Sequence, residues 1–164
     1  KHGIRLGLGL KATAEHREGQ SYPFIHQAEE LLTLIRTTGH NYVGLALDTW
    51  NWSLGGGAND QLSELTGDQV ISVSIADTPS EVDPATAKAT DRLLPTPETL
   101  EDHAKLLAML GGRGFVGPVT LKPHSRQLGK LTRDASVDKC ASLLSKLWNA
   151  AGLSKVAKPP AEAQ

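Results

Sequence analysis

The chain has 164 residues, and its 17 lysines and arginines against 18 aspartates and glutamates leave a formal net charge of -1. This balance offers no basic surface for nucleic acid, and no stretch approaches the ~20 apolar residues of a membrane span. The single cysteine, Cys140, excludes an internal disulfide framework and a cysteine-based zinc site. Because Cys140 lies within an apolar helical pattern, we expect a buried, unreactive thiol in a reducing compartment, the cytoplasm.

The first half of the chain alternates strand and helix patterns. Residues 5–10 predict a strand, and residues 24–35 predict an amphipathic helix that ends at Gly39. Residues 43–48 predict a second strand, and residues 60–65 predict a short helical turn.

The second half repeats this order. Residues 70–77 predict a third strand, and a helix with Thr96 as its N-cap follows and ends at Gly111 and Gly112. Residues 118–122 predict a fourth strand. Residues 137–151 carry the widest apolar helical stripe, which Gly152 closes. Four strand-helix units in succession predict an α/β fold with parallel strands and helical crossovers.

We expect one domain over residues 1–153 and a disordered tail or linker over residues 154–164, which lack an apolar period. The chain opens at Lys1 without a methionine or a leader. We therefore interpret it as a piece of a longer protein.

The strands share one alternation, which predicts two different faces of the sheet. The apolar positions are expected to face the helices: Leu6, Leu8, Leu10, Val43, Leu45, Leu47, Ile71, Val73, Ile75, Val119 and Leu121. The small and polar positions are expected to line a concavity. At the carboxyl ends of the strands, where barrels place their chemistry, they are Gly9, Asp48, Ser74 and Lys122.

An ordered series of segments resembles a known family: RLGLGL, YPFIHQAEELLTLI, VGLALDTWNWSLGGG, VISVSIAD, DRLLPTPETL, GPVTLKPHS and LLSKLWNAAGL. From Arg5 to Leu153 the chain resembles the carboxyl-terminal half of a xylose-isomerase-like TIM barrel, the group of sugar phosphate isomerases and epimerases. The resemblance implies strands five to eight of a (β/α)8 barrel. It also implies that a first half-barrel, or self-association, completes the fold.

The resemblance further implies a divalent metal, Mg²⁺ or Mn²⁺, held by a glutamate, an aspartate, a histidine and a second glutamate. Asp48 matches the aspartate, whereas Gly9, Ser74 and Lys122 stand at the other three positions. Both general-base carboxylates are missing, and a lysine ammonium repels a dication. We therefore expect that this chain binds no metal and that its metal-dependent isomerase or epimerase catalysis is impaired or lost.

Of two further family positions, one departs from the family pattern and the other matches it. Asn51 stands where the family has a helper histidine and is a candidate substrate-binding residue, and Arg92 matches the arginine that contacts a substrate hydroxyl or phosphate. Arg92 could instead form a loop ion pair with Asp91. His16, His26, His40 and His103 show no partners at metal spacing.

The remaining polar and aromatic candidates each allow two interpretations. Lys122 could form a buried structural ion pair with Asp48, or act as a catalytic base or Schiff-base amine. Trp50 and Trp52 could stack on a sugar ring or pack a loop, and His124 could touch a ligand or remain a surface group.

Three functions stay open for the chain: an isomerase or epimerase completed by other residues, a non-catalytic sugar-binding module, or a structural barrel module of a larger protein. Metal binding together with sugar binding would indicate the first. Sugar binding without metal would indicate the second, and neither would indicate the third.

Overall fold

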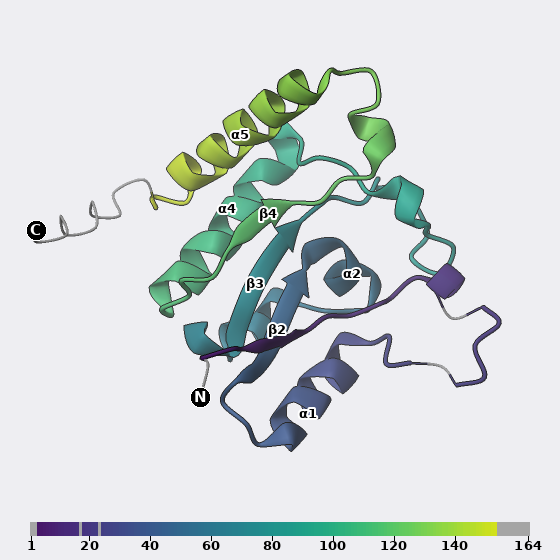
Figure 1. The fold of residues 1–164 in the computed structure, drawn as a ribbon, viewed down its shortest axis with the longest axis vertical. Helices are drawn as coiled ribbons and strands as arrows, with labels where there is room; N and C mark the ends of the chain where they lie inside the picture. Colours follow the sequence, from purple (N-terminus) through teal and green to yellow (C-terminus); the bar gives the residue numbers. More distant parts are fainter. Residues whose placement is uncertain (1–2, 17, 23, 154–164) are drawn as a thin grey trace, which may run out of the picture.

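The computed structural model describes residues 3–16, 18–22 and 24–153. Its strands are β1 (Leu6–Leu8), β2 (Val43–Asp48), β3 (Val70–Ile75) and β4 (Val119–Leu121). They form one sheet in the order β1-β2-β3-β4, and every neighbouring pair is parallel (Figure 1). The predicted parallel α/β fold is confirmed. The predicted tail, residues 154–164, lies outside the described residues.

Within the described residues, five α-helices connect or follow the strands: α1 (Ala28–Thr38), α2 (Thr49–Leu54), α3 (Asn59–Ser63), α4 (Pro97–Gly112) and α5 (Arg133–Ala150). Short 3₁₀ turns span Ala14–His16, Gly67–Gln69, Ala89–Asp91 and Ser125–Gln127. Gly39 ends α1 at a φ of 63°, in the left-handed region that glycine favours. Thr96 is the N-cap of α4, as predicted.

Several boundaries differ from the prediction: β1, β3 and β4 are shorter than residues 5–10, 70–77 and 118–122, and α5 begins at Arg133 instead of residue 137. The first helix begins at Ala28, not at Phe24, which precedes α1 and is 61% exposed. α4 continues through Gly111 and Gly112, and Gly114 takes the left-handed conformation after it. Helix α2 was not predicted, because six residues with two tryptophans show no clear helical period.

The core lies between one face of the sheet and the long helices. Leu45 and Leu47 of β2 and Val73 and Ile75 of β3 are buried there. They pack with residues from α1, α4 and α5: Leu31, Leu32, Ile35, Leu106, Leu107, Leu110 and Leu147. The predicted division of the sheet into a helix-covered apolar face and a second face is therefore present.

Ile71 is an exception to that division. The register between β2 and β3 shifts, so that Leu45 pairs with Val70 but Ala46 pairs with Ser72. Val70 therefore joins the core, whereas Ile71 lies against the opposite face, over Gly7 and Gly44. A Cβ at Gly44 would lie 2.5 Å from the backbone oxygen of Gln69, so this close approach requires glycine.

The ends of the sheet are less covered than predicted. Leu6 is 54% exposed because β1 is an edge strand. Val137 on α5 is 60% exposed and Cys140 is half-buried, which corrects the expectation of a buried thiol. α5 packs against α4 and β4. In the part of the chain that the structure describes, no helix combines the length and apolarity needed to cross a membrane.

Candidate functional site

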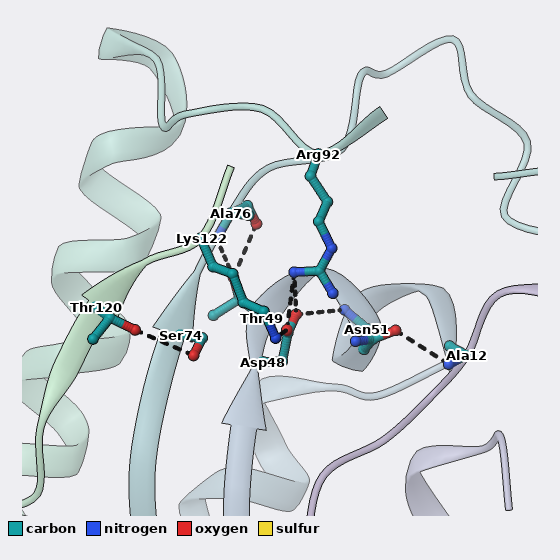
Figure 2. A network of polar contacts seen from close by, with 9 residues as sticks. All are labelled: Ala12, Asp48, Thr49, Asn51, Ser74, Ala76, Arg92, Thr120 and Lys122. Atoms are coloured by element: carbon teal, nitrogen blue, oxygen red, sulfur yellow. Dashed lines mark hydrogen bonds and ion pairs between the residues drawn. The ribbon is translucent and has the colours of Figure 1, made fainter. Parts of the chain in front are cut away.

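Polar side chains form a row across the second face of the sheet, near the carboxyl ends of the strands. Asp48 pairs in register with Ser74, and Ser74 pairs with Thr120. Residues paired in register share a face, and Lys122 lies two residues beyond Thr120 on that face. The Ser74 and Thr120 hydroxyls are 3.3 Å apart, and the Lys122 side chain extends from β4 toward Asp48 (Figure 2).

Asp48 is the centre of a hydrogen-bonded network. As the N-cap of α2, its Oδ1 accepts the backbone N–H of Asn51 at 3.1 Å. Nη1 of Arg92 donates to both carboxylate oxygens, at 3.2 and 2.9 Å, and Nζ of Lys122 donates to Oδ2 at 3.1 Å. The Asp48 side chain is 9% exposed. Its carboxylate is thus buried and engaged on both oxygens.

Arg92 is held over Asp48 by its backbone and by an aromatic ring. Its neighbour Leu93 exchanges two backbone hydrogen bonds with Asp77, and the carbonyl of Arg92 accepts the N–H of His124 at 3.0 Å. The guanidinium carbon lies 4.4 Å from the centroid of the Trp50 ring, a cation–π contact.

The alternative of a surface ion pair between Arg92 and Asp91 is therefore wrong. The Arg92 side chain is 10% exposed and its partner is Asp48. Asp91 instead accepts the backbone N–H of Lys88 at 2.8 Å, which closes its own 3₁₀ turn.

The expected contact of Lys122 with Asp48 is present, but its surroundings differ from the expectation of a buried pair. The Lys122 side chain is 56% exposed, so the buried cation of the network is Arg92. At this exposure Lys122 is not desolvated, which is the condition on which the base or Schiff-base interpretation depended.

The other predicted ligand-contacting residues have structural partners. Trp50 and Trp52 lie on α2 and are 1% and 5% exposed, so neither ring offers a face to a sugar. Asn51 is buried and its Oδ1 accepts the N–H of Ala12 at 3.1 Å, which ties α2 to the loop after β1. Nδ1 of His124 accepts the N–H of Arg126 at 3.3 Å and caps the turn that follows.

The residues at the four positions of the family's metal ligands do not suit a divalent cation. Such ions require several oxygen or nitrogen ligands with free lone pairs. Around Asp48 stand two cations and two hydroxyls, and both carboxylate oxygens already accept hydrogen bonds. Among the residues that the structure describes, no three His, Cys, Asp or Glu side chains gather as a metal site.

Gly9 stands just beyond β1 and places no side chain at the position of the family's first metal ligand. A Cβ there would lie 3.4 Å from the backbone oxygen of Ala46, an ordinary contact, and Gly9 has no positive φ. Unlike Gly44, this position admits a side chain.

A second polar cluster joins the end of β3 to α4. His103 and Thr99 donate to the carboxylate of Asp77, and the Thr96 N–H donates to Oδ2 at 3.3 Å. Burial raises the pKa of Asp77, but the hydrogen bonds from His103 and Thr99 and the charge of His103 outweigh it, and the pKa lies below its ordinary value.

Sequence reasoning did not find this cluster. Asp77 and His103 are 26 residues apart, and only the path of the loop between β3 and α4 brings them together. The available signal was Asp77 itself, a polar residue two positions beyond the end of the buried strand β3.

Comparisons with known proteins agree with the observed fold. A sequence profile described as xylose isomerase-like TIM barrel matches residues 2–146. A xylose isomerase domain protein from Alicyclobacillus acidocaldarius subsp. acidocaldarius is similar over 94% of this chain and 53% of its own, with 25% identity and a TM-score of 0.69. An IolI protein with a bound zinc atom is similar over 92% of this chain and 50% of its own, with 18% identity and a TM-score of 0.69.

A fusion of a xylose isomerase-like TIM barrel with a 4-hydroxyphenylpyruvate dioxygenase is similar over 74% of this chain and 18% of its own, with 22% identity and a TM-score of 0.55. No curated protein sequence gives a significant match. The chain thus spans about half the length of the first two structures, as half of a TIM barrel does.

Proposed function

The chain belongs to the xylose isomerase-like TIM barrel family, and on that premise we propose that it forms the ligand-binding mouth of a barrel that has lost metal-dependent isomerase or epimerase catalysis. The ion pairs of Asp48 with Arg92 and Lys122 take the place of the family's metal centre. The ligand class is a sugar or a sugar derivative. The ligand class is inferred from the family, and the loss of catalysis is inferred from the residues at the four metal-ligand positions, Gly9, Asp48, Ser74 and Lys122.

The observation that carries the proposal is the saturation of Asp48. A divalent metal at this carboxylate would have to displace Nη1 of Arg92 and Nζ of Lys122 and then lie next to both positive charges. Gly9, Ser74 and Lys122 supply no carboxylate or imidazole in return. Without general-base carboxylates, the proton transfer next to a carbonyl that interconverts sugars has no agent among these residues.

Two loops meet beside Asp48 and Arg92. Oε1 of Glu15, in the turn after β1, accepts the N–H of Ala89, in the turn between β3 and α4, at 2.7 Å. Asn51 holds the base of the first loop through Ala12. Arg92 and Asp48 are covered here, while Lys122 is open to solvent.

A metal titration with a restored variant tests the proposal. The native chain should bind Mn²⁺ or Zn²⁺ more weakly than about 10 μM, or roughly -7 kcal/mol, by calorimetry. A variant with Gly9→Glu, Ser74→His and Lys122→Glu regains the family's ligand set beside Asp48 and should bind either metal at least tenfold more tightly. Tight binding by the native chain that Asp48→Ala abolishes would overturn the proposal.

A second candidate is an active isomerase or epimerase whose missing groups come from a first half-barrel or a second copy of the chain. The half-length match favours this alternative, because the mouth of a closed barrel is lined by loops from both halves. Turnover of a sugar phosphate that requires an added divalent metal would support it.

A further inference from the structure

We propose that the ligand group bound at this mouth is an oxyanion, a carboxylate or a phosphate, which Lys122 holds beside the hydroxyls of Ser74 and Thr120. This inference rests on the proposed function, a mouth that binds its ligand without a metal. It adds the chemical class of the ligand and names the side chains that recognise it.

The charges of the network leave one cation in excess. Asp48 contributes one negative charge, and Arg92, buried and bonded to both carboxylate oxygens, neutralises it. Lys122 adds a second positive charge, and its side chain is 56% exposed. An ammonium has three N–H donors, and Asp48 accepts from one of them in the described structure, so two remain for a ligand.

The face of the sheet that carries Lys122 also carries two neutral hydroxyl groups. The Ser74 and Thr120 hydroxyls lie on the same face, one step below Lys122 along the strands (Figure 2).

The aromatic residues argue against recognition of a neutral sugar ring. Such recognition relies on an exposed aromatic face, and Trp50 and Trp52 are buried, with the Trp50 ring covered by Arg92. A charged group of the ligand is therefore the part that this mouth can distinguish. Charge-assisted hydrogen bonds to an ammonium supply both the affinity and the direction.

Paired probes that differ in charge test the inference. Binding of D-gluconate and of inorganic phosphate to the 164-residue chain is compared with that of D-glucitol, a neutral polyol of the same length as gluconate, by calorimetry and by chemical-shift titration. We expect gluconate to bind about tenfold more tightly than glucitol, which is the effect of one charge-assisted hydrogen bond. The preference should weaken as salt is added.

Variants at two positions of the network should act in opposite directions. Lys122→Met removes the charge but keeps an unbranched side chain, and should abolish the preference for gluconate, while Lys122→Arg should restore it. Asp48→Asn removes the competing carboxylate and keeps a good N-cap for α2, and should strengthen anion binding severalfold. The matched control is Lys105→Met, which removes an exposed lysine on α4 and should change nothing.

The outcomes separate this inference from the proposed function. Equal binding of gluconate and glucitol would overturn the anion inference and leave a metal-free polyol site. Failure of both anions to bind, or weaker anion binding in Asp48→Asn, would also overturn it. Tight Mn²⁺ binding would overturn the proposed function, whatever the anions do.

Discussion

The burial of Arg92 and the exposure of Lys122 predict very different contributions of the two cations to stability. Arg92→Met leaves the Asp48 carboxylate, 9% exposed, without the guanidinium nitrogen that donates to both of its oxygens. Breaking a buried pair from one side costs ~3 to 5 kcal/mol, and the remaining bond to Lys122 places the expected loss near the lower value. Lys122→Met removes a partner that is 56% exposed, and should cost about 1 kcal/mol or less.

Urea unfolding at a fixed protein concentration measures both losses. Tryptophan emission reports the region directly, because the Trp50 ring contacts Arg92. Combining each substitution with Asp48→Asn gives two coupling energies, and the coupling of Arg92 with Asp48 should be the larger by about 2 kcal/mol. Equal losses for Arg92→Met and Lys122→Met, or no coupling between Arg92 and Asp48, would refute the reasoning.

Three further predictions concern other parts of the fold. The pKa of Asp77 is lowered in the folded state, so its carboxylate stabilises the fold fully above the ordinary carboxyl pKa, about 4. This stabilisation is lost as the pH falls through the lower folded pKa. The free energy of unfolding should therefore fall less steeply on acidification in Asp77→Asn than in the native chain. Gly44→Ala should destabilise by about 1 to 3 kcal/mol in thermal melts, whereas Gly9→Ala should be neutral within about 0.5 kcal/mol. The unpaired edges of β1 and β4 should make the chain self-associate, and a monomer at every concentration in sedimentation experiments would contradict this.

The sequence predicted the strands and the parallel order because both have local signals. Alternation marked β2 to the residue, and Gly39 and Thr96 marked helix ends through their backbone preferences. The face of Ile71 was wrong because a register shift depends on the neighbouring strand, and nothing in residues 70–77 alone reveals it.

The site was predicted in part, for a similar reason. Asp48 and Lys122 lie at the carboxyl ends of the second and fourth strands, on the same face of the sheet with one strand between them, so a contact across that strand could be expected. Arg92 follows a long loop, and its position is set by the His124 N–H that its carbonyl accepts and by the two backbone bonds between its neighbour Leu93 and Asp77. The local sequence suggested the adjacent Asp91 as its partner, and only the folded loop shows that Asp48 is.

Asp48 both caps α2 and neutralises the buried Arg92, and these two structural roles affect how the site changes during evolution. Substitutions at Gly9, Ser74 or Lys122 alter the mouth without loosening a helix. A substitution at Asp48 also removes the cap of α2 or leaves the buried Arg92 without its counter-charge. Selection for folding alone is therefore sufficient to retain this aspartate once selection for catalysis is relaxed, and in diverged relatives we expect it to outlast the residues at the other three metal-ligand positions.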